Sequence, residues 1–570
     1  MKSWTVWAIS VVGIALALAT AYGAYTLAGY SWNQVVDYKT PYAEMDVETA
    51  ADGREPMAVA APDVAAHRVV LVVIDGLPTA TAFEMPSIAA LAERGARVDV
   101  TISQPSLSFP GWTNIVTGAS PQISGVTTNY QDTKVPVESI FDSLAAEGKT
   151  LGVVGSSDMD MLYGVNALTS RTVLEPWPTH DRYATGDWVN AAIAMELDSR
   201  PDFLYVHIPD IDNIGHEFGG DSRQWDDTAA AVDADLARFF NAVDDGSTTF
   251  VVLPDHGRIA AGGHGGWEPE TINTWAIFAG PGVAPSGGSR PSVPLEDIAP
   301  TVSILAGVRT PAFASGTAIS EVLAAGADTA LALEAQRNVA FAEAYANVVN
   351  ADRDYATGAA SSYDSPADYI EAVTDSRLTA ERWGRLPLAL GIVGAALAIT
   401  VGLAVLLGAP LAAVLSGALT YVIAYNAAFF GIHGYLWSLS AFNEESMVDA
   451  FMNGRLMDAA MAGVLGVVVA AVVFALVSRK SGEAARPSLG RYFGVGITTA
   501  WAMIATLALQ IGWFLWWWGA EITWVLPDFK WAFKYDLDLV QATALGAAAL
   551  VGPVVAIAIG WAARRVQSRA

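Results

Sequence analysis

The chain has 570 residues, of which 53% are apolar and 16% are charged, and its formal net charge is −27. A single hydrophobic core stops growing near about 250–300 residues, so we expect more than one domain. The acidic balance argues against nucleic acid as a partner, and the absence of cysteine excludes disulfides and thiolate chemistry.

The N-terminal region, residues 1–36, contains a long uncharged run that predicts a transmembrane helix. No charged residue occurs from Ser3 to Val36, and about 20 apolar residues suffice to cross a bilayer. The sequence Ala19-Thr20-Ala21 resembles a cleavage site, so a cleaved signal peptide is the alternative. The apolar run continues to about Tyr30, beyond the usual core of a signal peptide, and this favours an anchor.

Residues 37–66 are rich in Ala, Pro and Asp without a clear period, and we expect a linker there. The region 67–316 then alternates short apolar runs with helical patterns. The apolar runs lie at residues 69–74, 150–155, 202–208 and 248–257, and such runs are typical of buried parallel strands. This alternation predicts an α/β domain with a mainly parallel sheet flanked by helices.

Residues 317–385 are alanine-rich and acidic, and they predict a helical extension of this domain. Residues 386–570 contain five further uncharged stretches, two within 386–443 and one each at 459–478, 494–518 and 542–561. We therefore expect six transmembrane helices, five of them in an all-α C-terminal domain. Almost no ionisable residue lies inside these five spans, which argues against a transporter.

Basic residues predict the orientation in the membrane. They lie between the fourth and fifth spans and after the sixth: Arg479, Lys480, Arg486, Arg491, Arg564, Arg565 and Arg569. Both groups are expected on the cytoplasmic side. Residues 37–385 would then lie on the extracytoplasmic side of the cytoplasmic membrane or of an equivalent secretory membrane.

Carboxylates and imidazoles follow three of the predicted strands. They are Asp75, Asp212, His216, Asp255, His256 and His264. Ligands of open α/β sheets bind beyond the carboxyl ends of the strands, so we expect these side chains to meet at one edge. Oxygen and imidazole suit zinc, with manganese or iron as competitors, and six such groups exceed what one four-coordinate ion needs. We therefore predict two divalent ions, which can clamp both oxygens of an in-line displacement at phosphorus.

Such a site needs a nucleophile, either water or an activated hydroxyl. The stretch 104–118 offers four hydroxyls, those of Ser106, Ser108, Thr113 and Thr117. Serine-rich loops often only cap helices, and the residue types alone do not choose among the four.

The chain also carries an ordered set of motifs: VVIDG, PSLSFPGWTNIVTGASPQISGV, DNIGH, DHG, GGHGG and DIAPTVSILAGV. In order and spacing this set resembles the type I phosphodiesterase/nucleotide pyrophosphatase branch of the alkaline phosphatase superfamily, from about Val69 to Val322. The resemblance implies an alkaline phosphatase-like catalytic domain.

The resemblance also implies roles for single positions. Ser108 matches the nucleophile, and Asn129 matches an asparagine that supports a phosphoryl oxygen. Asp212, His216 and His264 match the ligands of one metal ion; Asp75, Asp255 and His256, with the Ser108 oxygen, match those of the other. Serine stands where nucleotide pyrophosphatases commonly have threonine, which leaves the substrate class open. Trp112 stands where sulfatases need arginine.

The order of anchor, exported domain and helical bundle resembles the glycosylphosphatidylinositol ethanolamine-phosphate transferases. We therefore expect a membrane-embedded, two-metal phosphodiesterase or phosphoryl-group transferase, including one of the phosphoethanolamine type. Its expected substrate is a lipid or lipid-linked phosphodiester at the bilayer. A chain ending near Ala380 is expected to retain activity on small soluble diesters.

Two alternatives remain open. One is a phosphomonoesterase, which the absence of arginine from the nucleophile loop disfavours. The other is a non-catalytic binding or transport protein. The sequence does not indicate an oligomeric state.

Overall fold

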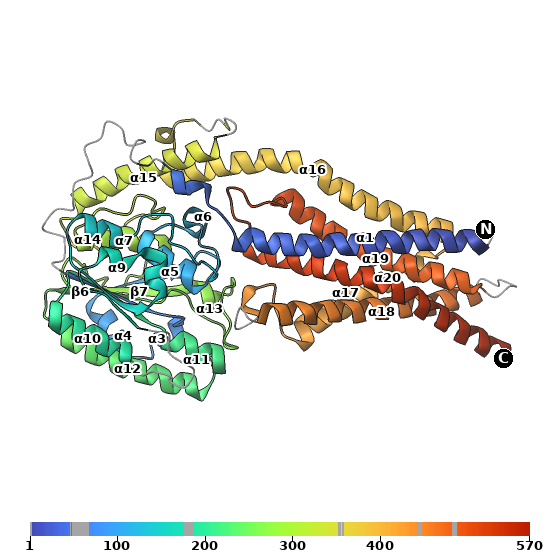
Figure 1. Cartoon of the computed structure of the whole chain (residues 1–570), viewed down its shortest axis with the longest axis horizontal. Coiled ribbons are helices and arrows are strands. Elements are labelled where there is room, and N and C mark those ends of the chain that lie inside the picture. The colour runs from blue at the N-terminus through green and yellow to red at the C-terminus, as the bar shows by residue number, and fades with distance from the viewer. Residues whose placement is uncertain are drawn as a thin grey trace.

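The computed structural model describes residues 3–45, 47, 68–175, 186–351, 355, 358–441, 447–480 and 487–569. The chain forms a sheet domain and a long helical bundle placed end to end (Figure 1). Both termini lie at the end of the bundle that is far from the sheet domain. Most of the expected linker at 37–66 falls outside the described residues.

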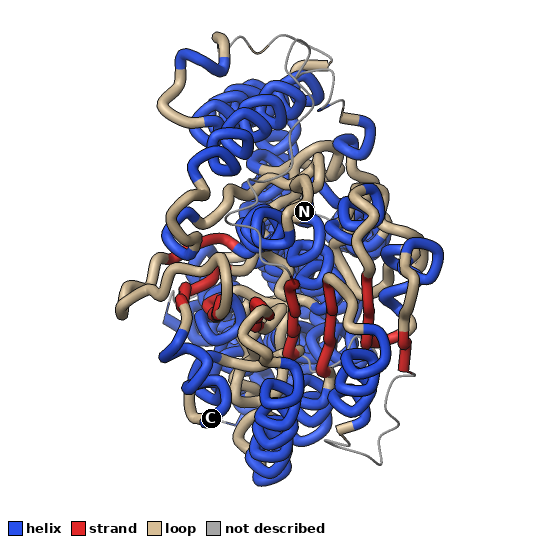
Figure 2. The backbone as a smooth tube through the Cα atoms, turned by 90° about the vertical axis from the view of Figure 1, so that its left-hand side faces the viewer, coloured by secondary structure: helices blue, strands red, loops and turns tan. Residues whose placement is uncertain are grey.

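The sheet has eight strands in the order β4-β3-β5-β1-β6-β7-β2-β8, and Figure 2 shows it between its covering helices. The strands are β1 Arg68–Ile74, β2 Ala96–Thr101, β3 Leu151–Ser156, β4 Val173–Glu175, β5 Phe203–Ile208, β6 Thr248–Leu253, β7 Asn273–Ala279 and β8 Ser292–Pro294. β7 runs antiparallel to β6 and β2, and the other neighbours pair in parallel. The predicted α/β domain with a mainly parallel sheet is therefore confirmed.

Helices cover both faces of the sheet because its central strands are apolar on both sides. The helices of this domain are α3 Thr79–Ala82, α4 Pro86–Arg94, α5 Ser108–Thr117, α6 Pro121–Ser124, α7 Ile140–Ala146, α8 Asp158–Tyr163, α9 Val165–Leu168, α10 Asp187–Ser199, α11 Asp210–Phe218, α12 Arg223–Val243, α13 Pro269–Ile272, α14 Ile298–Ala306 and α15 Asp328–Val349. Short 3₁₀ turns lie at Pro41–Glu44, Leu295–Asp297, Ser320–Val322, Ala360–Ser362 and Leu439–Ala441.

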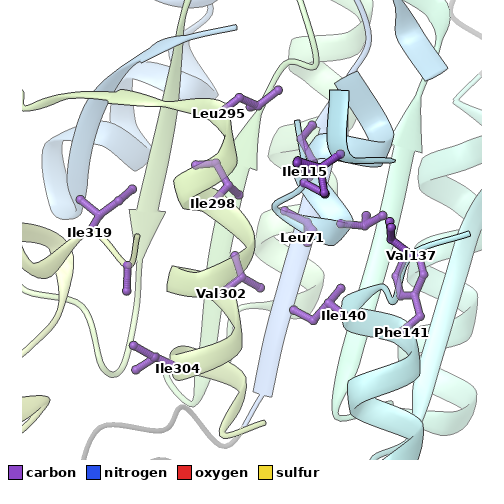
Figure 3. Packing of buried hydrophobic residues seen from close by; sticks show 14 of the residues in the cluster. Leu71, Ile115, Val137, Ile140, Phe141, Leu295, Ile298, Val302, Ile304 and Ile319 are labelled. Atoms are coloured by element: carbon purple, nitrogen blue, oxygen red, sulfur yellow. The ribbon is translucent and has the colours of Figure 1, made fainter. Parts of the chain in front are cut away.

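Each face of β1 belongs to a different apolar core. Leu71 packs with Ile140 of α7 and Val302 of α14 in one core (Figure 3). Val70 and Val72 belong to the core on the other face, with α4, α10 and α12. Burying one such side chain contributes roughly 1.5–3 kcal/mol, so these two cores fix the strand ends that carry the polar residues.

Within the described part of the chain, six helices are long and apolar enough to cross a membrane, which agrees with the predicted number. They are α1 Ser3–Val36, α16 Pro366–Leu407, α17 Leu411–Asn426, α18 Val448–Lys480, α19 Leu489–Trp517 and α20 Phe529–Arg569, and a π-helical segment, Ala427–Ile432, extends α17. α19 lies at the centre of the bundle, and 89% of its most apolar 18-residue stretch is buried. The indole of Trp501 on α19 donates to the carbonyl of Gly13 on α1 at 2.9 Å, so the first helix packs against the bundle core.

α18 and α20 begin more than two turns before the predicted spans. α18 begins at Val448 and α20 at Phe529, and the added turns carry Arg455, Asp458, Lys534, Asp536 and Asp538. The spans predicted at 459–478 and 542–561 were read from uncharged runs, so they stopped at these residues. The bundle is therefore more polar at the end that meets the sheet domain than its predicted spans indicated.

Direct contacts join the bundle to the sheet domain. α16 continues without a break from the sheet domain into the bundle (Figure 1), so the predicted extension and the first C-terminal span share one helix. The hydroxyl of Tyr42 donates to the carbonyl of Trp524 at 2.9 Å. The amide of Leu526 donates to the side chain of Gln122 at 3.2 Å. These contacts set the height of the sheet domain over the bundle.

Candidate metal and nucleophile site

Three adjacent strands bring the predicted site residues together. β5, β1 and β6 are neighbours in the sheet, and their carboxyl ends lie side by side because they run in parallel. Asp75 follows β1, and Asp255 and His256 follow β6. Asp212 and His216 lie one turn apart on α11, which follows β5. His264 reaches the same place from the glycine-rich loop after β6.

One group of ligand atoms forms around Asp75, Asp255 and His256. The three side chains are fully buried, and their ligand atoms lie within 4.8 Å of one another. His256 Nε2 is 3.3 Å from Asp75 Oδ1, 3.6 Å from Asp255 Oδ2 and 3.3 Å from Ser108 Oγ. This arrangement brings together all four residues that the resemblance assigns to one ion.

A second group forms around Asp212. His216 Nε2 lies 2.9 Å from Asp212 Oδ2 and 3.1 Å from His264 Nε2. The His256 ring stacks on the His264 ring with centroids 4.0 Å apart. His256, Asp212 and His264 thus also satisfy the distance condition for one ion. His256 therefore belongs to both groups, whereas the resemblance assigned it to only one metal ion.

Backbone carbonyls orient two of the imidazoles. His256 Nδ1 lies 3.0 Å from the carbonyl of Gly257, and His264 Nδ1 lies 3.1 Å from the carbonyl of Ser106. A ring nitrogen that donates to a carbonyl carries the proton, so the Nε2 lone pair of each ring is directed at the site. Both rings thus present the atom that a metal ion binds.

Two of the buried carboxylates have oxygens that are available to a cation. One oxygen of Asp255 accepts the amides of Gly76 at 3.1 Å and of His256 at 2.9 Å. Among the described residues, the other Asp255 oxygen and Asp75 Oδ1 have no hydrogen-bond donor. Burial, and then the charge of Asp75, raise the pKa of Asp255 to about 8. Burial and the charge of Asp212 raise the pKa of Asp75 as well. Two divalent cations fit this set of donors.

Arg258 supports Asp212, and the sequence reading did not include it. Its guanidinium is buried, makes an ion pair with Asp212 and donates to the carbonyl of Gly262 at 2.9 Å. Burial alone would raise the pKa of Asp212, but His216, Arg258 and His264 hold it well below its usual range. The available signal was its position two residues after His256.

His207 was also missed, because it lies inside the apolar run of β5. Its Nε2 is 2.9 Å from Asp75 Oδ2, and its ring meets that of Trp112 edge-on at 4.5 Å. Burial lowers the pKa of His207 to about 4, so the ring is neutral, and one of its nitrogens shares a hydrogen bond with Asp75. His207 therefore turns the other Asp75 oxygen toward the site. The alternation of side chains along β5 was the available signal.

The structure distinguishes the four candidate hydroxyls. Ser106 donates to the carbonyl of Gly266 at 2.9 Å, Thr113 pairs with the Tyr163 hydroxyl at 3.1 Å, and Thr117 donates to the carbonyl of Thr113 at 2.6 Å. Among the described contacts, the Ser108 hydroxyl is the one of these four hydroxyls that lies against a candidate ligand, His256. It is also the first residue of α5, whose N-terminal amides and dipole favour anions.

Asn129 lies against the same helix end. Its side-chain oxygen accepts the amide of Phe109 at 2.9 Å. The amide nitrogen of Asn129 remains as a donor beside Ser108, because the oxygen is engaged. This position is compatible with the role that the resemblance assigns to it.

The bundle contacts the loop that carries His264. The amide of Gly266 donates to Ser440 Oγ at 3.1 Å, and that hydroxyl donates to Glu268 Oε2 at 2.9 Å. The indole of Trp267 donates to the carbonyl of Trp437 at 2.8 Å. A Cβ on Gly266 would lie 1.8 Å from Ser438 Oγ, so only glycine admits this approach. We call these contacts the loop–bundle junction.

Comparisons with known proteins agree with these motifs. Residues 69–290 match the family model described as type I phosphodiesterase/nucleotide pyrophosphatase. The chain is 26% identical over 215 residues to GPI ethanolamine phosphate transferase 3 of Schizosaccharomyces pombe, covering 36% of this chain and 23% of the relative. It is 25% identical over 252 residues to GPI ethanolamine phosphate transferase 1 of Mus musculus, covering 38% and 27%.

Both matches leave most of each relative uncovered, so the chain spans about a quarter of the length of these two transferases. Among solved structures, wild-type alkaline phosphatase PafA aligns with a TM-score of 0.40 at 15% identity, covering 46% of this chain and 100% of that chain. Murine ectonucleotide pyrophosphatase/phosphodiesterase 5 aligns with a TM-score of 0.37 at 11% identity, covering 43% and 96%. The predicted resemblance is thus confirmed: residues 69–290 match the type I phosphodiesterase/nucleotide pyrophosphatase family, and the chain is similar to GPI ethanolamine phosphate transferases.

Proposed function

We propose that the chain is a membrane-embedded, metal-dependent phosphodiesterase or phosphoryl-group transferase with Ser108 as its nucleophile. One observation carries this proposal: the Ser108 hydroxyl, at the start of α5, lies 3.3 Å from His256 within a buried cluster of carboxylates and imidazoles. The matched family and the transferase relatives support the same reaction class.

Two divalent ions, with zinc favoured and manganese as the alternative, would be held by this cluster. Asp75, Asp255, His256 and Ser108 would hold one, and Asp212, His216 and His264 the other. When bound, such ions polarise phosphoryl oxygens and lower the pKa of a coordinated hydroxyl. The unsatisfied oxygens of Asp75 and Asp255 and the directed Nε2 atoms support this assignment.

Residues of the chain would supply the nucleophile and the groups that stabilise the phosphoryl oxygens. The Ser108 hydroxyl would lose its proton as its oxygen forms a bond to phosphorus and the bond to the leaving alkoxide breaks. The alkoxide takes up one proton, so a phosphoseryl enzyme and a free alcohol result. The Asn129 amide and the N-terminus of α5 would stabilise the phosphoryl oxygens as their charge grows. Water or an acceptor alcohol then takes the phosphoryl group, and Ser108 recovers its proton.

Diesters fit this site better than monoesters. A monoester dianion needs additional positive charge, and Arg258 is the buried cation nearest to the ligands. Its guanidinium is already engaged by Asp212 and by the carbonyl of Gly262. We therefore assign a phosphodiester substrate, lipid-linked as the transferase relatives suggest, and place residues 67–316 on the extracytoplasmic side as the catalytic domain.

The proposal is tested by the turnover of a chromogenic phosphodiester and a chromogenic monoester by purified full-length protein, with zinc or manganese. The diester should be preferred, and chelation should abolish turnover. Ser108→Ala should lower turnover by roughly a thousandfold or more, as for other lost nucleophiles, while two ions remain bound. Ser106→Ala is the comparison variant: it removes a neighbouring hydroxyl that holds the Gly265–Gly266 loop, so it should weaken the site but keep measurable turnover, which Ser108→Ala should lose. Full activity of the Ser108 variant would exclude the proposed nucleophile.

A further inference from the structure

One face of α5 carries both Ser108 and Trp112, which lie four residues apart. Side chains with this spacing lie on the same side of a helix. Ser108 is 7% exposed and Trp112 is 1% exposed, so this face is packed inside the sheet domain. The proposed nucleophile and a large aromatic side chain therefore belong to one buried helix face.

The backbone of α5 lies in contact with a candidate ligand. A Cβ added to Gly111 would lie 2.8 Å from the carbonyl oxygen of Asp255 and 3.1 Å from its Cβ. A side chain larger than that of glycine would therefore displace Asp255 or the helix. The helix that begins at Ser108 is thus held at close range against the end of β6.

Trp112 contacts the other carboxylate of the same ligand group, Asp75, through His207. The Trp112 ring meets the His207 ring edge-on, with centroids 4.5 Å apart and planes at 66°. Such an edge-to-face arrangement is a favoured geometry for aromatic pairs. His207 Nε2 lies 2.9 Å from Asp75 Oδ2. Trp112 therefore restricts the ring that in turn restricts Asp75.

The indole N–H of Trp112 is also close to Asp75. Burial and then the charge of Asp212 raise the pKa of Asp75, and the Trp112 side chain is among the groups that oppose this rise. Among the described residues, the buried indole N–H has no acceptor in hydrogen-bond geometry. A buried donor without an acceptor is costly, so an approach of the Asp75 carboxylate to this N–H is favoured.

We propose that Trp112 is a positioning residue for the phosphoryl transfer. Its indole N–H and its contact with His207 hold the Asp75 carboxylate, and its helix holds Ser108 beside the same ligand group. The nucleophile and a ligand of its ion thus keep a fixed separation. A fixed separation matters because small displacements of reacting groups slow a reaction strongly. This role rests on the proposed function.

The test removes the indole N–H without changing the shape of the ring. Benzothienylalanine, which has sulfur in place of the N–H, is introduced in place of Trp112 in the full-length protein. The affinity for one of two zinc ions should fall roughly tenfold, as for other groups that orient a ligand. The kcat for a chromogenic diester should fall by a similar factor. KM and the melting temperature of the metal-free protein should stay unchanged, because the apolar contacts remain.

Trp275 on β7 provides the matched control. It is fully buried, and its indole N–H also has no acceptor among the described residues. Its ring lies 5.5 Å from that of Phe83, and it belongs to the core on the opposite face of the sheet from Trp112. Benzothienylalanine in place of Trp275 should therefore leave both ion affinities and kcat unchanged.

Two further measurements separate positioning from packing. The visible absorption of the cobalt-substituted protein reports ligand geometry, and it should shift in the Trp112 variant but not in the Trp275 variant. His207→Gln should also weaken ion binding. Its effect combined with the Trp112 replacement should be smaller than the product of the two single effects, because both side chains act on Asp75.

Ion affinities, kcat and cobalt absorption equal to those of the wild type would overturn the proposal and leave Trp112 as a core residue. A lower melting temperature without a change in ion affinity would overturn it as well, and fully multiplicative effects would exclude a shared action on Asp75. A wild-type protein that binds no ions or does not turn over the diester would instead reject the proposed function, and the role of Trp112 with it.

Discussion

The three carboxylates of the site differ in the side chains that contact them. Asp212 is paired with the buried Arg258, whereas Asp75 and Asp255 each retain an oxygen that no donor among the described residues reaches. An oriented carboxylate binds an ion more tightly than a mobile one, because less side-chain entropy is lost. Arg258 therefore acts on the site through Asp212.

Changing Arg258 to Met should lower the affinity for one of the two ions by roughly ten- to a hundredfold, the usual effect of losing a residue that orients a ligand. Zinc titration followed by elemental analysis measures this. Arg258→Lys should recover only part of the affinity, because one ammonium cannot contact both Asp212 and the carbonyl of Gly262. Arg223→Met is the control, since Arg223 is 89% exposed on α12. Unchanged affinity of both ions would exclude this role.

The sequence indicated the clustered carboxylates and imidazoles better than the residues that orient them. The six side chains could be expected to meet because each follows a strand or lies in a glycine-rich loop, and parallel strands bring these positions together. Arg258 and His207 contact ligands only through the fold. The choice of Ser108 among four hydroxyls also needed either a family motif or the contacts of the other three.

At the scale of elements, the position of the His264 loop depends on a segment nearly two hundred residues away in the chain. Ser440, in the 3₁₀ turn Leu439–Ala441, links the amide of Gly266 to Glu268. No local pattern predicts a contact of this kind, because Ser440 lies in an uncharged stretch that predicts membrane spans and Gly266 lies in a glycine-rich loop.

Ser440→Ala should lower metal affinity and lower the melting temperature. It leaves the buried Gly266 amide and Glu268 carboxylate without this partner, at a cost of about 1–3 kcal/mol for each unsatisfied group. Zinc titration and thermal unfolding in detergent measure the two effects. Ser416→Ala is the matched control, because its hydroxyl only donates to the carbonyl of Ala413 in its own helix. Equal behaviour of the two variants would show that the loop–bundle junction does not support the site.

At the scale of the whole molecule, the sheet domain and the bundle contact each other directly. From the sequence we expected only a linker and a helical extension between them. The expected alternation of strands and helices and the number of spans were both correct, because they follow from hydrophobic patterns within one segment. The packing of Tyr42, Gln122 and the Gly265–Trp267 loop on the bundle involves long-range contacts, which such patterns do not contain.

A chain ending at Ala380 should therefore lose most of its activity even on small soluble diesters, contrary to the expectation from the sequence. It lacks Trp437, Ser438 and Ser440, which hold the loop after His264. The kcat/KM for a chromogenic diester and the zinc content of the shortened and full-length chains measure this. Equal values for both would show that the sheet domain forms its site alone and that the bundle serves only as a support.

The placement of both termini at the end of the bundle opposite the sheet domain has a practical consequence for labelling. A fluorescent or affinity tag at either end would sit across the bilayer from the proposed reaction. Protease added to one side of sealed vesicles would then reach either the tag or the sheet domain, but not both. The part that survives the protease, either the tag or the sheet domain, would show which side of the membrane each lies on, without any assay of catalytic activity.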